Sequence, residues 1–175
     1  MIIMLKIEQL ALIVNTYNRN QLMKIGIISD THSIRAGGYE IPDWVREAFL
    51  KSDLIIHAGD VETPEVLEAL KEIAPVYAVR GNCDSYDLKT PSYISVNIGI
   101  GLLTAAHKPA TARNALEADT KVLVYGHTHI STISEENGLL VINPGSPAFP
   151  RGGLPASVAV LIVEKGKLFP RIIHR

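Results

Sequence analysis

The amino-acid sequence predicts an α/β fold in which two packed β-sheets carry helices on their outer faces. In the first part of the chain, short apolar runs alternate with helical patterns, whereas the last part reads as strands joined by tight turns. Hydrophobic residues make up 47% of the 175 residues and charged residues 20%, which is typical of one domain with an ordinary globular core. Polar residues of ligand type follow four of the apolar runs, which indicates a site at the carboxyl ends of strands.

In the first part of the chain, strands and helices are expected to alternate. Pro42 suits the first turn of one helix. A second helix opens at Thr63, which can cap it, and Pro64 fits its first position. The buried face of that helix is marked by Val66, Leu67, Leu70 and Ile73. The expected elements are, in order, strand 25–28, helix 42–51, strand 53–59, helix 63–73 and strand 75–79.

The second part of the chain is richer in strands. Gly99 separates two of them, and a short helix and a buried strand follow. Turns at 136–138 and 165–166 each join a hairpin, and the Asn137-Gly138 pair is a strong hairpin signal. The expected elements are strands 93–98 and 100–105, helix 109–118, strand 121–125, and the hairpin strands 131–134, 139–142, 156–163 and 167–173.

Residues 1–22 are predicted to be an N-terminal extension, and residues 23–175 a single domain. The apolar run 10–14 is too short to span a membrane, and the residue order of a signal peptide is absent. We expect a soluble extension that forms a helix or an edge strand, or that reaches a second subunit of a homodimer.

Charge and cysteine content exclude several classes of protein. A net charge of −1 and a pI of about 6.6 give no support for a nucleic-acid-binding or membrane-binding surface. Cys83 is the single cysteine, so neither an intrachain disulfide nor a thiolate-rich zinc site can form. Nucleic-acid and membrane partners are therefore not expected, and a cytoplasmic location is the simplest interpretation.

Two pairs of ligand-type residues share the same spacing. His127 and His129 follow the strand 121–125, and Asp30 and His32 follow the first strand. Residues at i and i+2 of an extended chain project to the same side, so each pair can face one metal ion. Neutral imidazole is the commonest metal ligand among side chains, which makes a metal site the natural hypothesis.

Two further strand ends add oxygen ligands, because Asp60 follows Gly59 and Asn82 follows the strand 75–79. A set of carboxylate, imidazole and amide groups suits Mn²⁺, Fe, Co²⁺, Ni²⁺ or catalytic Zn²⁺. Two ions roughly 3.5–4 Å apart, bridged by one carboxylate, would use the whole set and activate water toward a phosphoryl group. The six expected ligands are Asp30, His32, Asp60, Asn82, His127 and His129.

The order Asp-x-His, Gly-Asp, Gly-Asn-x-Asp and Gly-His-x-His resembles that of the calcineurin-like metallophosphoesterases. Residues 79–84 (VRGNCD) and 143–146 (NPGS) are similar to their small YfcE-type phosphodiesterases, and the resemblance covers about residues 23–173. It implies a four-layer α/β/β/α sandwich of two mixed sheets flanked by helices, with a dinuclear metal site. It also implies hydrolysis of small phosphodiesters by a metal-bridging hydroxide, without a covalent enzyme intermediate.

The resemblance also implies a role for each ligand. Two divalent ions are expected, Mn²⁺ first, with Ni²⁺, Co²⁺, Fe²⁺ or Zn²⁺ as alternatives. The implied ligands are Asp30, His32 and His129 for one ion, Asp60 as the bridge, and Asn82 and His127 for the other.

Two positions depart from the family pattern. Cys83 stands where many members carry a histidine thought to protonate the leaving group, which suggests a preference for diesters or good leaving groups. Direct alignment places Ala105 at the remaining ligand position, with His107 two residues later. His107 either completes the second metal site, if the strand end shifts, or faces substrate or surface, and then the second ion is weakly held or absent. The residues expected in catalysis are Asp60, Asn82, Cys83 and His107.

Three other features carry weaker expectations. His57, on an apolar strand, is expected to be a hydrogen-bonded residue that supports Asp60. Residues 143–146 form either a plain turn or a phosphate contact through free backbone N–H groups. Arg151 is a candidate phosphate contact.

The leading hypothesis is a divalent-metal-dependent phosphodiesterase, supported by six intact ligands. The alternative is a weakly active or inactive scaffold of the same fold that acts as a protein-interaction module, and Ala105 is the residue that favours it.

Overall fold

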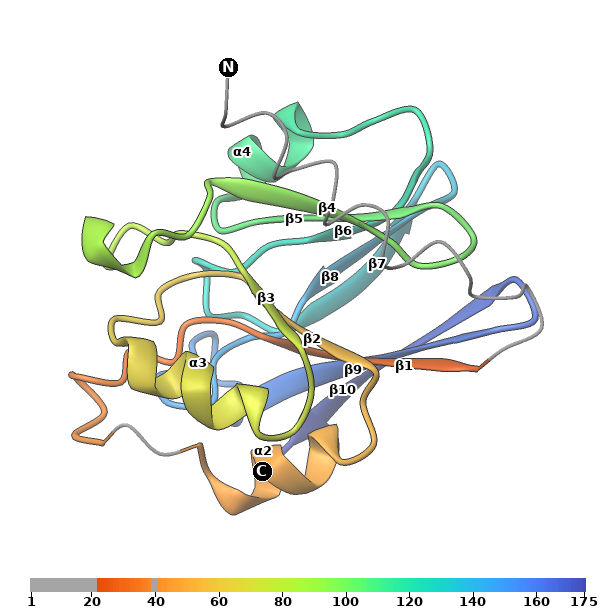
Figure 1. Cartoon of the computed structure of the whole chain (residues 1–175). Coiled ribbons are helices and arrows are strands. Elements are labelled where there is room, and N and C mark those ends of the chain that lie inside the picture. Colours follow the sequence, from red (N-terminus) through yellow and green to blue (C-terminus); the bar gives the residue numbers. More distant parts are fainter. Residues whose placement is uncertain (1–21, 39–40) are drawn as a thin grey trace.

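The computed structural model describes residues 22–38 and 41–175, which form two five-stranded sheets packed face to face (Figure 1). Helices α2 and α3 cover the outer face of one sheet, and α4 covers the outer face of the other. The predicted four-layer α/β/β/α architecture is therefore confirmed. The expectations for the N-terminal extension fall almost entirely outside the described residues. No helix among these residues is long and apolar enough to cross a membrane.

The first sheet has the strand order β10-β9-β1-β2-β3. Strands β1, β2 and β3 are parallel, whereas β9 pairs antiparallel with both β1 and β10, so the sheet is mixed. Its elements and covering helices are β1 (Met23–Ile28), α2 (Asp43–Phe49), β2 (Leu54–His57), α3 (Pro64–Lys71), β3 (Val76–Ala78), β9 (Ser157–Glu164) and β10 (Lys167–His174).

The second sheet has the strand order β4-β5-β6-β8-β7. Its central strands β5, β6 and β8 are parallel, and β4 and β7 close the two edges in antiparallel pairing. A short 3₁₀ helix, η1 (Tyr86–Leu88), lies in the connection from the first sheet. The other elements are β4 (Tyr93–Asn97), β5 (Leu102–Ala106), α4 (Pro109–Asn114), β6 (Thr120–Val124), β7 (Thr132–Glu136) and β8 (Leu139–Asn143).

The largest hydrophobic cluster lies between the two sheets. Ile25 and Ile27 of the first sheet pack in it with Leu103, Val122 and Val124 of the second, and all five are fully buried. Alternate residues of a strand face opposite sides, so the residue between the two isoleucines, Gly26, faces α2 instead. A Cβ at Gly26 would lie 2.9 Å from the ring of Phe49, so only glycine lets this helix pack so closely.

Two helix starts differ from the sequence prediction. Pro42 precedes α2 as its N-cap and does not lie in the first turn. Thr63 precedes α3, but its side chain makes no capping hydrogen bond. Its hydroxyl instead lies 3.0 Å from the Ser33 hydroxyl, because the loop after β1 packs against this end of the helix and offers a competing partner.

Both predicted hairpins are present, and one strand ends later than expected. Strand β7 continues through Glu136, so the turn consists only of Asn137 and Gly138. Both residues have positive φ angles, 51° and 80°, as a two-residue turn of type I′ requires. Lys165 and Gly166, with φ angles of 50° and 76°, form the same kind of turn between β9 and β10.

Candidate metal centre

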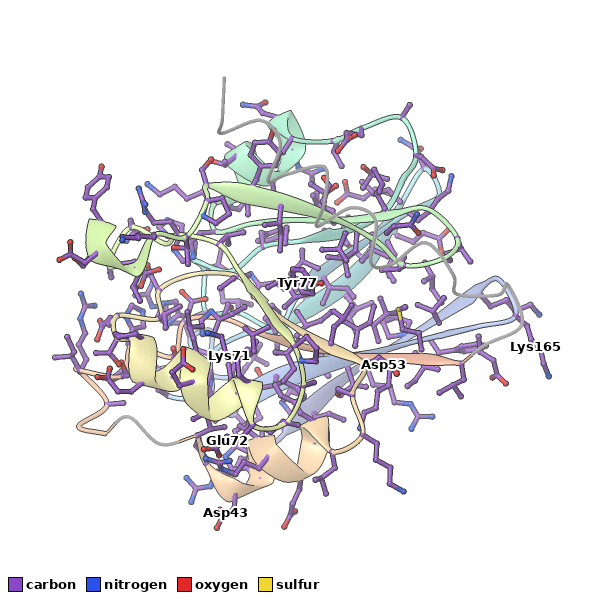
Figure 2. All side chains as sticks on the ribbon, viewed as in Figure 1. Asp43, Asp53, Lys71, Glu72, Tyr77 and Lys165 are labelled. Carbon is purple, nitrogen blue, oxygen red and sulfur yellow. The ribbon has the colours of Figure 1, made fainter. Side chains whose placement is uncertain are left out.

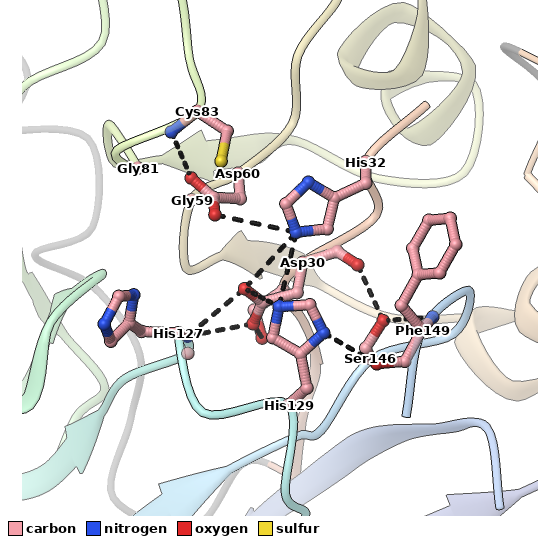
Figure 3. A network of polar contacts seen from close by, with 12 residues as sticks. Asp30, His32, Gly59, Asp60, Gly81, Cys83, His127, His129, Ser146 and Phe149 are labelled. Carbon is pink, nitrogen blue, oxygen red and sulfur yellow. Dashed lines mark hydrogen bonds and ion pairs between the residues drawn. The ribbon is translucent and has the colours of Figure 1, made fainter. Parts of the chain in front are cut away.

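The six expected metal ligands and the candidate ligand His107 all lie in loops that follow strands of the two sheets. The loops after β1, β2 and β3 come from the first sheet, and those after β5 and β6 from the second. Figure 3 shows side chains from both sheets converging on one small volume. Most are deeply buried, with exposed fractions of 0% for Asp30 and 3% for His107, whereas Asn82 is exposed and opens the site to solvent.

One group of ligand atoms gathers around Asp30. Its Oδ1 lies 3.2 Å from Nε2 of His129 and 4.0 Å from Nε2 of His32. The two histidine Nε2 atoms are 3.3 Å apart, and the rings are stacked with centroids 5.1 Å apart. These three side chains can therefore offer one ligand atom each to a single ion.

A second group gathers around His107. Its Nε2 lies 3.1 Å from Oδ1 of Asn82, 3.3 Å from Oδ2 of Asp60 and 3.3 Å from Nδ1 of His127. The same Asp60 oxygen is 3.6 Å from Nε2 of His32, in the first group. Asp60 thus stands between the two groups and is close to a histidine of each.

The histidine tautomers can be assigned from their outer hydrogen bonds. Nδ1 of His107 lies 2.9 Å from the carbonyl oxygen of Ala58, and Nδ1 of His129 lies 2.6 Å from that of Phe149. A carbonyl oxygen only accepts, so Nδ1 carries the proton in each ring, and in the neutral ring Nε2 presents a lone pair to the centre. His32 is held in the same way through Nδ1, 2.9 Å from a Glu62 carboxylate oxygen.

This donor set fits divalent cations. Two imidazole lone pairs 3.3 Å apart repel each other unless a proton or a cation lies between them. Atoms that share a metal at about 2.0–2.2 Å are separated by a similar distance, and histidine ligands usually donate their other N–H to a carboxylate or carbonyl, as these do.

The pKa shifts of three site residues also indicate that the centre favours positive charge beside its carboxylates. Burial lowers the pKa of His107, but hydrogen bonding to Asp60 and its negative charge outweigh this effect and leave the pKa raised. Hydrogen bonding to Asp30 raises the pKa of His129. Burial raises the pKa of Asp60, yet hydrogen bonds from His107 and from the backbone N–H of Cys83 bring it far below its ordinary value.

The ligand pairs do not lie in extended chain, so that part of the sequence argument is wrong. Strands β1 and β6 end at Ile28 and Val124, before the ligands begin. The φ angles of Asp30, His32, His127 and His129 are 55°, 43°, 68° and 60°, and that of Asp60 is 56°. Non-glycine residues adopt this left-handed conformation at a cost, and such strain concentrates at functional sites.

The position of His107 resolves the question raised by Ala105. The Ala105 side chain is fully buried in the cluster between the two sheets, so it does not face the site. Strand β5 ends at Ala106, and His107 is the first residue beyond it. The alignment argument for a missing ligand is therefore wrong, because the bend at the strand end brings His107 to Asp60 and Asn82.

Two buried or partly buried carboxylates were missed as site residues by the sequence analysis. Asp84 accepts hydrogen bonds from the backbone N–H groups of Asp60 (3.0 Å), Glu62 (2.7 Å) and Gly81 (2.7 Å), which ties the loops after β2 and β3 together. Glu62 orients His32. Asp84 belongs to the Gly-Asn-x-Asp motif and could have been found, whereas no pattern marks Glu62.

Cys83 lies at the edge of the centre. Its backbone N–H donates to Asp60 at 2.8 Å, and its Sγ is 3.3 Å from Nδ2 of Asn82. Burial, together with the charge of Asp60, raises the pKa of the thiol, so the sulfur stays protonated and is a poor nucleophile.

Two of the weaker expectations change with the structure. His57 is fully buried and contacts Thr31 (3.1 Å) and the backbone N–H of Gly59 (3.2 Å), so it supports the backbone around Asp60 and not its carboxylate. Burial lowers its pKa to about 4.

Residues 143–146 are buried, and the Gly145 N–H donates to Asn143, so this segment offers no free phosphate contact there. Its function is structural, since the Ser146 hydroxyl donates to the Asp30 carbonyl at 2.7 Å. Arg151 is exposed, and its backbone N–H donates to the carbonyl of His129 at 3.0 Å.

The fold and the paired ligand groups define a two-sheet α/β protein with a candidate metal centre at one end of its strands. The model of the calcineurin-like phosphoesterase superfamily domain matches residues 23–166. A probable metallophosphoesterase of Methanothermobacter thermautotrophicus is 39% identical over 161 residues, which are 87% of this chain and 92% of that protein. The phosphodiesterase YfcE of Escherichia coli K12 is 31% identical over 80% of this chain and 88% of that protein.

Among solved structures, Vacuolar Protein Sorting 29 from Cryptosporidium parvum is similar, with a TM-score of 0.69 and 26% identity. The match covers 88% of this chain and 98% of that one. The chain belongs to the calcineurin-like phosphoesterase superfamily.

Proposed function

We propose that this protein is a divalent-metal-dependent phosphodiesterase that hydrolyses small phosphodiesters. The observation that carries the proposal is the position of Asp60, whose Oδ2 lies 3.3 Å from His107 in one ligand group and 3.6 Å from His32 in the other. The name of the Escherichia coli relative, a phosphodiesterase, supports the substrate class.

The proposed centre holds two ions, with Mn²⁺ expected first and Ni²⁺, Co²⁺, Fe²⁺ or Zn²⁺ as alternatives. When bound, such ions supply an activated water and neutralise charge on phosphoryl oxygens. One ion would be held by Asp30, His32 and His129, the other by Asn82, His107 and His127, and Asp60 would belong to both.

The protein residues contribute position and charge to this reaction. Hydrogen bonds from Nδ1 of His107 and His129 to carbonyl oxygens fix which nitrogen faces the centre. Asn82 is exposed, so the second group is open to a substrate from solvent. Cys83 keeps its proton and is assigned no nucleophilic function, because the phosphorus is attacked by water in this proposal.

The scaffold hypothesis loses the observation that favoured it. It depended on Ala105 occupying a ligand position, and the Ala105 side chain lies in the core between the sheets. The likeness to Vacuolar Protein Sorting 29 is equally compatible with either hypothesis, because the two chains share a fold.

The test is Asp60→Asn in chelator-stripped protein, with Mn²⁺ titrated by calorimetry and hydrolysis of an aryl phosphodiester followed in parallel. We expect wild type to bind two ions and to turn over only with metal. The variant should lose the activity, by at least about a thousandfold, because a shared anionic ligand is removed. Full activity in this variant would contradict the proposal.

Asp43→Asn is the matched control. Asp43 is an exposed aspartate at the start of α2 (Figure 2), outside the two ligand groups, and its substitution removes the same charge. Metal stoichiometry and turnover should remain those of wild type. Circular dichroism of both variants establishes that each is folded.

A further inference from the structure

Arg35 lies in the loop after β1, three residues beyond the expected ligand His32. Its side chain is 60% exposed. The guanidinium nonetheless has a defined position, because Nε is 3.2 Å from Oε1 of Glu62 and Nη2 is 3.4 Å from Sγ of Cys83. An exposed arginine is therefore directed along the edge of the metal centre.

The backbone at Arg35 is also held in position by Glu62. The backbone N–H groups of Ile34 and Arg35 donate to Oε2 of Glu62, at 2.9 Å and 3.2 Å. The other Glu62 oxygen bonds the ring of His32. One carboxylate thus fixes the orientation of a predicted metal ligand and the direction of the arginine.

The far end of the guanidinium borders the centre itself. The Cys83 sulfur, which Nη2 contacts, lies within 4.8 Å of a ligand atom of His32 and of one of Asp60. A phosphoryl group held between the two ligand groups would therefore bring an oxygen close to this end of Arg35.

The present partner of Nη2 is a weak one. The partner is the sulfur of Cys83, at 3.4 Å. A cysteine sulfur is a weak acceptor, whereas a phosphate oxygen forms short, charge-assisted hydrogen bonds with a guanidinium. Among the described residues, one Nη2 N–H donates to this sulfur and Nε is ion-paired with Glu62, which leaves further N–H donors for a ligand.

We propose that Arg35 binds a non-bridging phosphoryl oxygen of the substrate, in a subsite bordered by Cys83 and Glu62. The ligand class is a phosphate ester anion or inorganic phosphate. This inference rests on the proposed function, because it assigns a substrate contact within the same site. Arg35 acts there by binding and orienting the anion, and it transfers no proton, since its guanidinium stays charged.

The first measurement is the dissociation constant of inorganic phosphate for Mn²⁺-loaded protein, by calorimetry, in wild type, Arg35→Met and Arg35→Lys. A hydrogen bond between charged groups typically corresponds to a ten- to hundredfold change in affinity. We expect phosphate binding to weaken by that factor in Arg35→Met and by less in Arg35→Lys, which keeps the charge but not the planar fork.

Arg46→Met is the matched control, because Arg46 is paired with Glu72 outside the ligand groups and the same charge is lost. Mn²⁺ affinity is measured on every variant. It should change by less than about threefold in Arg35→Met, whereas a merely structural function through Glu62 would weaken metal binding along with phosphate binding.

Steady-state hydrolysis of an aryl phosphodiester gives the second readout, an increase in KM for Arg35→Met with partial rescue by Arg35→Lys. If wild type binds phosphate through Arg35 but shows no metal-dependent turnover, the subsite stands and the proposed function fails. If wild type binds no phosphate, or Arg35→Met binds it as tightly as wild type, the subsite is overturned.

Discussion

The two sheets contribute different chemistry to one centre. The loops of the first sheet supply Asp30 and Asp60, both carboxylates, together with His32 and Asn82. The loops of the second sheet supply only imidazoles, from the segment after β5 and from the segment after β6.

The loops of the first sheet are also joined to one another by hydrogen bonds. The backbone N–H of Asp30 donates to the Gly59 carbonyl at 2.9 Å, and that of His32 to the Asp60 carbonyl at 3.1 Å. Asp84 ties the next loop to the same segment. The residues from the first sheet, which include both carboxylates, form the anionic half of the centre and are joined by hydrogen bonds into one unit. The imidazoles from the second sheet form the neutral half, which meets the anionic half only when the two sheets pack together.

The largest expected effect compares the two halves directly, through Asp30→Asn and His129→Gln. These side chains contact each other at 3.2 Å, so they probe the same ligand group. Asp30→Asn removes an anion and should weaken Mn²⁺ binding at this group by about a thousandfold. His129→Gln removes a neutral ligand and should weaken it by about a hundredfold or less. Calorimetric titration measures both, and equal losses would contradict the division of charge between the sheets.

The next effect concerns His57, a buried histidine that contacts the backbone N–H of Gly59, next to Asp60. The pKa of His57 is lowered to about 4 by burial, against 6.5 in the unfolded chain. Between these values the unfolded state binds more protons, so this histidine lowers stability as the pH falls from 6.5 to 4 and has no effect above that window. The shift corresponds to about 3 kcal/mol of unfolding free energy.

The measurement is urea unfolding of metal-free protein at pH 7 and pH 4.5, in wild type and His57→Gln. The variant lacks the titrating group, so the wild type should lose more stability over this interval. Metal-free protein is needed because metal binding is itself pH-dependent. A difference between the two proteins that stays constant with pH would contradict the assignment of a buried neutral imidazole.

The smallest effect concerns Glu62, which orients His32 from the loop after β2. Glu62→Gln keeps an acceptor for the His32 N–H but removes the charge, and we expect Mn²⁺ affinity to fall by about tenfold. Glu72→Gln, at the exposed end of α3, is the control and should bind metal as wild type does. Unchanged affinity in Glu62→Gln would mean that hydrogen-bond geometry alone orients the ring.

The failures of the sequence prediction have a common physical cause. The residues that follow Thr63 predict it as the cap of α3, and direct alignment with the family pattern places Ala105 at a ligand position. In the structure, the Thr63 hydroxyl contacts that of Ser33, which comes from another loop. The bend beyond β5 brings His107, and not Ala105, close to Asp60. Contacts between loops of different strands decided both cases, and no local pattern encodes them.

The sequence alone determined the fold class, the approximate position of most strands and the identity of the ligand-type residues. It could do so because apolar periodicity and the residue types that follow each strand are local properties of the chain. Only the tertiary structure decided which nitrogen of each imidazole faces the centre, that His107 joins the second group, and that Glu62 and Arg35 border the site. Those features depend on the packing of the two sheets and on five left-handed loop residues, which set side-chain directions that spacing in the sequence does not specify.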